Sequence, residues 1–171
     1  MTTTTATRPL ADRRATMSDI LIVRDYPHPP AKVWRALTEP ALMALWGMRP
    51  EGFSPTVGTR FKFVAKPQPG WRGFVECEVI EAREPSVLRY SWVGDESGKQ
   101  THVTYALEAT PGGTRLTFAH TGFTGIGGLL LARVVMTPIR KKMFGVRMPA
   151  VLSEIDDDGR QRPETTLKPK S

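Results

Sequence analysis

The sequence predicts an α+β domain in which an antiparallel sheet of about six strands carries a long C-terminal helix on its apolar face. Three observations support this fold class. Hydrophobic residues alternate with polar ones in five consecutive segments between residues 59 and 120. Two short helical patterns, each opened by a proline, precede these segments. A long apolar and basic segment follows the last of them.

The chain has 171 residues, of which 40% are hydrophobic and 24% charged, a composition typical of one globular domain. Residues 1–17 show no hydrophobic periodicity and are expected to form a disordered leader. Residues 156–171 are polar, contain Pro163 and Pro169, and are expected to form a disordered tail. The folded domain is therefore predicted at residues 18–155.

The first elements are set by β-branched residues and prolines. Residues 20–26 form a short apolar run that stops at prolines, which predicts a strand. Pro30 and Pro40 each suit the first turn of a helix, and Thr38 offers a capping hydroxyl to the second one. The apolar faces of these two helices are expected to hold Val33, Trp34 and Leu37, and then Leu42, Leu45 and Trp46.

Five alternating segments follow, joined by connectors rich in Pro, Gly, Asp and Ser at residues 66–70, 84–86, 94–98 and 110–113. Such short links predict an antiparallel meander with one apolar face. The inward-facing residues are predicted to be Phe61, Phe63, Val75, Cys77, Val79, Leu88, Tyr90, Trp92, Val103, Tyr105, Leu107, Leu116, Phe118 and His120.

The last element is a helix from about Leu129. Its broad apolar face is expected to lie on the sheet, whereas its basic residues are expected on the opposite side or at its end. Thr137-Pro138 should kink or divide the helix, because proline removes a backbone donor. The apolar face consists of Leu130, Leu131, Val134, Val135 and Ile139, and the basic residues are Arg133, Arg140, Lys141 and Lys142.

The formal net charge is +7, but its distribution argues against a nucleic-acid partner. Residues 18–125 hold 12 basic and 11 acidic residues, whereas residues 126–155 hold five basic residues and one acidic residue. A near-neutral body offers no basic groove, and the basic helix allows at most a weak contact with a membrane surface. Without a signal peptide, a membrane span or a second cysteine, a cytoplasmic location is expected.

The order of elements is that of the helix-grip fold. Three segments add to the pattern: Val33–Pro40 followed by Trp46, then Tyr90-Ser91-Trp92, and then residues 112–123. Together they resemble the START-like (SRPBCC, birch-pollen-allergen-like) superfamily over residues 18–125, in particular the bacterial homologues of the activator of the heat-shock-protein ATPase. Trp46 is followed by Gly47, where this branch usually has a second aromatic residue. The segment after residue 128 looks more like polyketide cyclases and lipid-binding relatives.

The resemblance implies a curved sheet and a cavity between its concave face and the long helix. The cavity would hold an apolar or polycyclic small molecule, with aromatic walls that carry a few polar tips. The alternative is that the same side chains pack a solid core. The candidate lining residues are Trp46, Phe61, Phe63, Tyr90, Trp92, Tyr105, Phe118, His120 and Met136.

His120 is the one candidate for a catalytic group, since a neutral imidazole at the end of the last strand can bond a ligand or act as a base. The favoured interpretation is a structural core histidine, since histidines in such motifs are more often structural. The sequence also offers His120 no second catalytic partner. Cys77 is expected to be an inert buried thiol. No metal is predicted, because the spacing typical of metal ligands is lacking among His28, His102 and His120. No cofactor is predicted either, because the sequence contains no nucleotide-binding motif.

Three functions therefore compete. The leading hypothesis is binding or sequestration of a lipid-like or polyketide-like molecule, including a role in natural-product resistance. The second is an aromatase/cyclase-like enzyme, and the third is a chaperone-regulating interaction module. The sequence leaves open whether the protein is a monomer or a homodimer.

Overall fold

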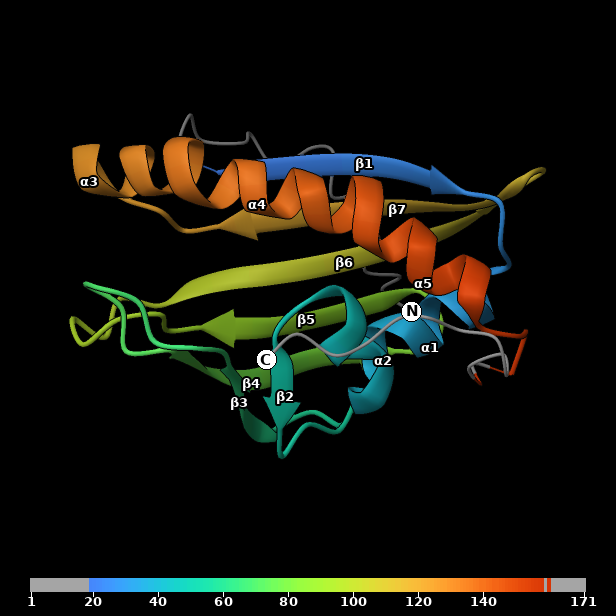
Figure 1. Ribbon diagram of the computed structural model, residues 1–171, viewed down its shortest axis with the longest axis horizontal. Helices are drawn as coiled ribbons and strands as arrows, with labels where there is room; N and C mark the ends of the chain where they lie inside the picture. The colour runs from blue at the N-terminus through green and yellow to red at the C-terminus, as the bar shows by residue number, and fades with distance from the viewer. Residues whose placement is uncertain (1–18, 159, 161–171) are drawn as a thin grey trace, which may run out of the picture.

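The structure, a computed structural model, describes residues 19–158 and residue 160. The expected leader at residues 1–17 and most of the expected tail lie outside the described residues. Seven strands form one antiparallel sheet in the order β1-β7-β6-β5-β4-β3-β2, and the sheet curls around a long helix (Figure 1). The predicted α+β helix-grip fold is confirmed.

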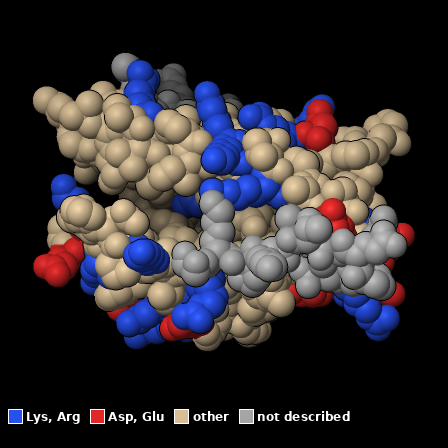
Figure 2. All heavy atoms as spheres, in the orientation of Figure 1, with Lys and Arg blue, Asp and Glu red and all other residues tan. Residues whose placement is uncertain are grey.

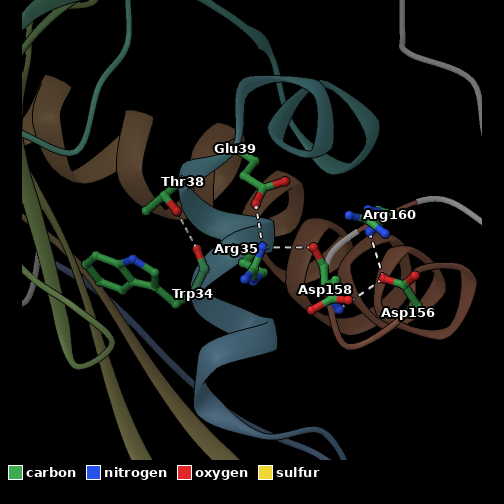
Figure 3. A network of polar contacts seen from close by, with 7 residues as sticks. All are labelled: Trp34, Arg35, Thr38, Glu39, Asp156, Asp158 and Arg160. Atoms are coloured by element: carbon green, nitrogen blue, oxygen red, sulfur yellow. Dashed lines mark hydrogen bonds and ion pairs between the residues drawn. The ribbon is translucent and has the colours of Figure 1, made fainter.

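The N-terminal strand and both short helices form where the sequence predicts them. Strand β1 (Ile20–Tyr26) is followed by α1 (Pro30–Thr38) and α2 (Pro40–Trp46), and each helix has its proline at the first position. The predicted cap by Thr38 is wrong. Its hydroxyl donates instead to the carbonyl of Trp34 at 2.8 Å (Figure 3), which closes the last turn of α1.

The meander consists of β3 (Arg60–Val64), β4 (Phe74–Arg83), β5 (Val87–Trp92), β6 (Thr101–Thr110) and β7 (Gly113–Thr121). One strand was not predicted, namely β2 (Arg49–Glu51), which pairs with β3 at the edge of the sheet. Three residues are too few to show a period of two, and Pro50 suggests a break in the chain. Strand β1 pairs with β7, so the first strand lies beside the last.

The C-terminal helix is continuous over 30 residues. It comprises α3 (Gly125–Leu130), η2 (Leu131–Met136), α4 (Thr137–Lys142), η3 (Met143–Arg147) and α5 (Met148–Glu154), of which η2 and η3 are π-helical. The expected division at Pro138 takes the form of a change in helix type, because the prolines at 138 and 149 each follow a π-helical segment. The wider turn before each proline replaces a break in the helix.

The prediction of which side of this helix faces the sheet is wrong. The apolar residues expected on the sheet are exposed, with Val134 at 67% and Ile139 at 48%, whereas Arg140 is 3% exposed. Figure 2 shows a largely uncharged surface at the α3 end of the molecule. The buried positions are instead Ala132, Arg140, Met143, Phe144, Met148, Val151 and Leu152.

Residues just beyond the predicted domain end contact α1. The Arg35 guanidinium donates to the carbonyl of Asp158 at 2.8 Å, and the backbone amide of Arg160 donates to the carboxylate of Asp156 at 2.9 Å (Figure 3). Lys32, which is buried, lies 3.8 Å from the Asp157 carboxylate. The ordered contacts of the domain therefore extend a few residues past Ile155.

Candidate functional site

A narrow pocket lies between the sheet and the C-terminal helix. Its volume is about 10 Å³, which is room for about one water molecule. A polycyclic molecule therefore fits only if the walls of the pocket move. The pocket is lined by Met43, Trp46, Gly47, Met48, Phe63, Tyr90, Trp92, Tyr105, Arg140 and Met143.

The residues predicted from the sequence divide into those that line this pocket and those that pack around it. The lining members are Trp46, Phe63, Tyr90, Trp92 and Tyr105. Those in the surrounding core are Phe61, Phe118 and His120, which are buried, and Met136, which is partly buried. Gly47, which follows Trp46 in the sequence, also lines the pocket.

Aromatic rings contact one another from β3 across the sheet to the helix. The ring of Tyr90 lies 5.4 Å from Phe61 and 5.7 Å from Phe63, and the ring of Tyr105 lies 5.4 Å from Phe118 and 6.1 Å from Phe144. These tilted and edge-to-face arrangements are the favourable ones for ring pairs. The walls of the pocket are therefore apolar, and their rings pack against one another.

Two tyrosine hydroxyls provide polar atoms inside this apolar lining. The hydroxyl oxygens of Tyr90 and Tyr105 are 2.9 Å apart. Burial raises the pKa of both phenols, so both stay protonated at neutral pH. Because one hydroxyl hydrogen is used in the bond between them, the pair keeps a second hydrogen for another acceptor.

Arg140, which the sequence placed on the solvent side, is the third polar group of the pocket. Its guanidinium carbon lies 4.7 Å from the centre of the Trp92 ring and 5.2 Å from that of Phe118. Nη1 approaches the sulfur of Met143 at 3.8 Å, which is a weak acceptor. Nε and Nη2 are buried and have no hydrogen-bond acceptor among the described residues.

A signal for the position of Arg140 exists in the sequence, but at an unusual period. Residues 132, 136, 140, 144, 148 and 152 recur every fourth position, and all of them are buried or partly buried. An ordinary α-helix has 3.6 residues per turn, so a strict four-residue stripe would drift around it. The π-helical turns absorb the extra residues and keep the stripe on one side.

His120 faces inward as predicted and is held by β6. Its Nε2 lies 2.8 Å from the Thr101 hydroxyl, which itself donates to the carbonyl of Trp92 at 3.2 Å. The Thr101 oxygen therefore accepts from Nε2–H, and Nδ1 is left as a buried acceptor without a hydrogen-bond donor. Burial, aided by the charge of Arg140, lowers the pKa of His120 to about 2.

This low pKa decides what His120 can do. The imidazole is neutral at physiological pH and is a very weak base, since effective general bases have a pKa near the working pH. Its ring lies 4.6 Å from Phe123 and 5.4 Å from Trp92. These contacts are those of a packed, hydrogen-bonded core residue.

Comparison with known proteins shows which family the chain belongs to. The family model described as activator of Hsp90 ATPase homolog 1-like protein matches residues 27–128. The chain belongs to this family. No match was found among the curated proteins. The matched segment of the activator-homologue family ends before most of the C-terminal helix, so Arg140 lies outside it.

Solved structures share the fold of this family member. Protein MLL2253 from Mesorhizobium loti is 32% identical, with 74% of this chain and 94% of that chain covered and a TM-score of 0.62. CalU16 from Micromonospora echinospora is 24% identical, with coverages of 76% and 75% and a TM-score of 0.61. DynU16, from the dynemicin biosynthetic locus, is 21% identical, with coverages of 80% and 47% and a TM-score of 0.62. The shared START-like helix-grip fold is a ligand-binding fold.

Other features of this family member are structural. Cys77 is free and buried, and burial raises the pKa of its thiol, which disfavours the reactive thiolate. Among the described residues, no cluster of His, Cys, Asp and Glu is suited to a metal ion. Within the same residues, no helix is both long and apolar enough to cross a membrane.

A second and larger hollow of about 640 Å³ lies over β2, β3, β4 and β5. It is open to solvent, and several of its charged residues pair with one another. Arg60 lies 3.2 Å from Glu78, and Lys62 lies 3.8 Å from Glu76. Exposed pairs of this kind contribute little energy and leave few charged groups for a ligand. The narrow pocket at Arg140, with its aromatic lining and unpaired buried donors, is the better candidate site.

Proposed function

We propose that this protein binds an apolar or polycyclic small molecule, of the lipid or polyketide type, between the sheet and the C-terminal helix. The supporting observation is the narrow pocket between the sheet and the helix, in which aromatic walls surround only a few polar groups. Binding sites for small molecules generally combine an apolar lining with a few placed polar groups. The likeness of fold to DynU16, from the dynemicin biosynthetic locus, agrees with a natural-product ligand. A role in natural-product resistance belongs to the same proposal.

Entry of such a ligand requires the helix to move, because the pocket has room for about one water molecule. The first part of the helix is weakly anchored. No residue of α3 is buried, and in η2 only Ala132 is. The later part carries Phe144, Met148 and Leu152, which are fully buried. Arg140 and Met143, which line the pocket, lie between these two parts of the helix, so the outward movement must extend to them. From α3 to Met143 the buried residues are Ala132, Arg140 and Met143, so this movement exposes little apolar surface.

Gly47 provides a direct test, because a side chain there would enter the pocket. A Cβ added at Gly47 would lie 3.3 Å from the terminal methyl of Met143, which is flexible enough to shift. We expect the wild-type protein to retain a small molecule in native mass spectrometry after incubation with cell extract, and Gly47→Leu to lose most of that mass. Gly112→Leu is the control, since a Cβ at Gly112 meets nothing within 4 Å.

The same samples decide against the proposal if wild-type protein retains no small molecule, or if Gly47→Leu retains it as well as wild type does. A fluorescence titration with pyrenebutanol, a neutral polycyclic probe, gives a second measurement. Saturable binding that Gly47→Leu weakens and Gly112→Leu preserves would support the interior as the site.

Catalysis receives no comparable support. An aromatase/cyclase-like reaction needs an acid or base that titrates near neutral pH, whereas the pKa of His120 is about 2 and the pKa values of Tyr90 and Tyr105 are raised. A chaperone-regulating role has the family description as its support. A cytoplasmic location agrees with the free Cys77, and the exposed apolar side chains beside Lys141 and Lys142 agree with a weak membrane contact.

A further inference from the structure

Arg140 is a buried charge whose partner is not among the described residues. Its side chain is 3% exposed, and no carboxylate in that part of the chain forms an ion pair with it. Its Nε and Nη2 have no acceptor. Burial of an unpaired charge is strongly unfavourable, so a group that serves only to fill space at this position would be expected to be apolar.

The contacts that Arg140 does make leave its donors available. Trp92 and Phe118 interact with the guanidinium through their ring faces, and this cation–π attraction favours the cation without using its N–H groups. The N–H bonds lie in the guanidinium plane. The rings therefore hold the group in place, while Nε and Nη2 stay free to donate.

The charge also acts on the rest of the pocket. Arg140 opposes the rise in the pKa of Tyr90 and Tyr105 and adds to the fall in the pKa of His120. Arg140, Tyr90 and Tyr105 line the same pocket, and the tyrosine pair has one hydroxyl hydrogen to spare. Positive charge and hydrogen-bond donors thus meet inside aromatic walls.

We infer that the ligand carries an anionic oxygen group, a carboxylate or an acidic phenol or enol, and that this group pairs with Arg140. A planar oxyanion matches the two donors on one side of a guanidinium, and the aromatic walls accommodate the rings attached to it. This inference rests on the proposed function and narrows it from apolar molecules in general to aromatic or polycyclic acids.

Two probes that differ in one group test the inferred pairing of an anionic ligand group with Arg140. Pyrenebutyrate and pyrenebutanol have the same rings and chain length, and only the first is anionic. Fluorescence titration should show wild-type protein binding the acid roughly tenfold more tightly than the alcohol, as expected for one charge-assisted hydrogen-bonded pair. The preference should persist in 0.5 M NaCl, because buried pairs are screened far less than exposed ones.

Three variants locate the effect. Arg140→Met should bind both probes about equally and the alcohol about as well as wild type does, whereas Arg140→Lys, which keeps the charge but not the planar pair of donors, should lose part of the preference. Lys141→Met removes an exposed charge at the next position and should leave the preference unchanged. Arg140→Met should also unfold at the same or a higher temperature, because it removes the unpaired buried charge.

Equal binding of the two probes by wild-type protein would overturn the inference and leave the proposed function standing. The inference also fails if Arg140→Met keeps the preference for the acid, or if it unfolds well below wild type, since Arg140 would then be a packing residue. Absence of binding by both probes would contradict the proposed function for polycyclic ligands and this inference with it.

Discussion

At the scale of single residues, His120 shows how burial determines chemistry. Its place on the inward face follows from the alternation in β7, which the sequence predicts. Its lowered pKa depends on its burial in the core and on the nearby charge of Arg140. The alternation of the sequence reveals neither of these. A histidine that looks like a base in the sequence is therefore a neutral hydrogen-bonding group in the fold.

This neutral state predicts how stability depends on pH. Between the unfolded pKa of 6.5 and the folded value of about 2, the unfolded chain binds a proton at His120 that the folded protein does not bind. Stability therefore falls as pH falls below 6.5. The loss is roughly 1.4 kcal/mol per pH unit, or about 2 kcal/mol between pH 7 and pH 5, measurable by urea unfolding at both values.

His120→Gln should remove most of this slope, since glutamine does not titrate. His102→Gln is the control, because the pKa of the partly exposed His102 is also lowered by burial but to a smaller degree, and most of the slope should remain. An unchanged slope in His120→Gln would show that His120 is not the titrating group.

The candidate site divides in the same way between what is predictable and what is not. Tyr90, Trp92 and Tyr105 are predictable because a period of two places them on one face of a sheet. Arg140 is not predictable because charged residues on an amphipathic helix are expected to face water. The closed state of the pocket depends on how side chains such as Met143 fill space, which no periodicity records.

At the scale of elements, the C-terminal helix departs most from expectation. Its presence, start and basic composition follow from the sequence, but the side that meets the sheet does not. The strongest apolar stripe at a period of 3.6 includes Leu130 and Val134, which are 56% and 67% exposed. The stripe that packs has a period of four, and it becomes visible only once the π-helical turns of η2 and η3 are known.

The predicted and the observed orientation of the helix on the sheet imply opposite effects of mutation. In the observed arrangement, Val134→Gln should change the free energy of unfolding by no more than about 0.5 kcal/mol. Phe144→Ala should lower it by roughly 3–5 kcal/mol, because Phe144 is fully buried against Trp46 and Phe118. Urea denaturation of the two variants measures both, and a larger loss in Val134→Gln than in Phe144→Ala would restore the orientation expected from the sequence.

At the scale of the whole molecule, the question is where the folded domain ends. The predicted unit of residues 18–155 contains all seven strands and the full C-terminal helix. Composition alone suggests an end at Ile155, because the acidic and polar residues that follow favour a solvated chain. The contacts of Arg35 with Asp158 and of Lys32 with Asp157 were not predictable, since they join segments more than 100 residues apart.

A comparison of two chain lengths tests this boundary. Chains of residues 18–155 and 18–160 should both fold, and the longer one should be more stable by roughly 1 kcal/mol, the typical net contribution of a hydrogen bond. Arg35→Ala in the longer chain should remove most of that difference. Equal stability of the two chains would show that residues 156–160 add nothing to the domain.

The π-helical segments also have a consequence for the length of the chain. A π-helical turn holds about one residue more than an α-helical turn, so η2 behaves as an α-helix with one residue inserted. Deletion of one residue within η2 can be absorbed by a return to α-helical geometry, and Arg140 would still face the sheet. Deletion of one residue from α4 has no such compensation and would turn the following side chains by about 100°. We therefore expect the fold to tolerate single-residue deletions in η2 and η3 and to lose stability when one residue is deleted from the α-helical stretches between them.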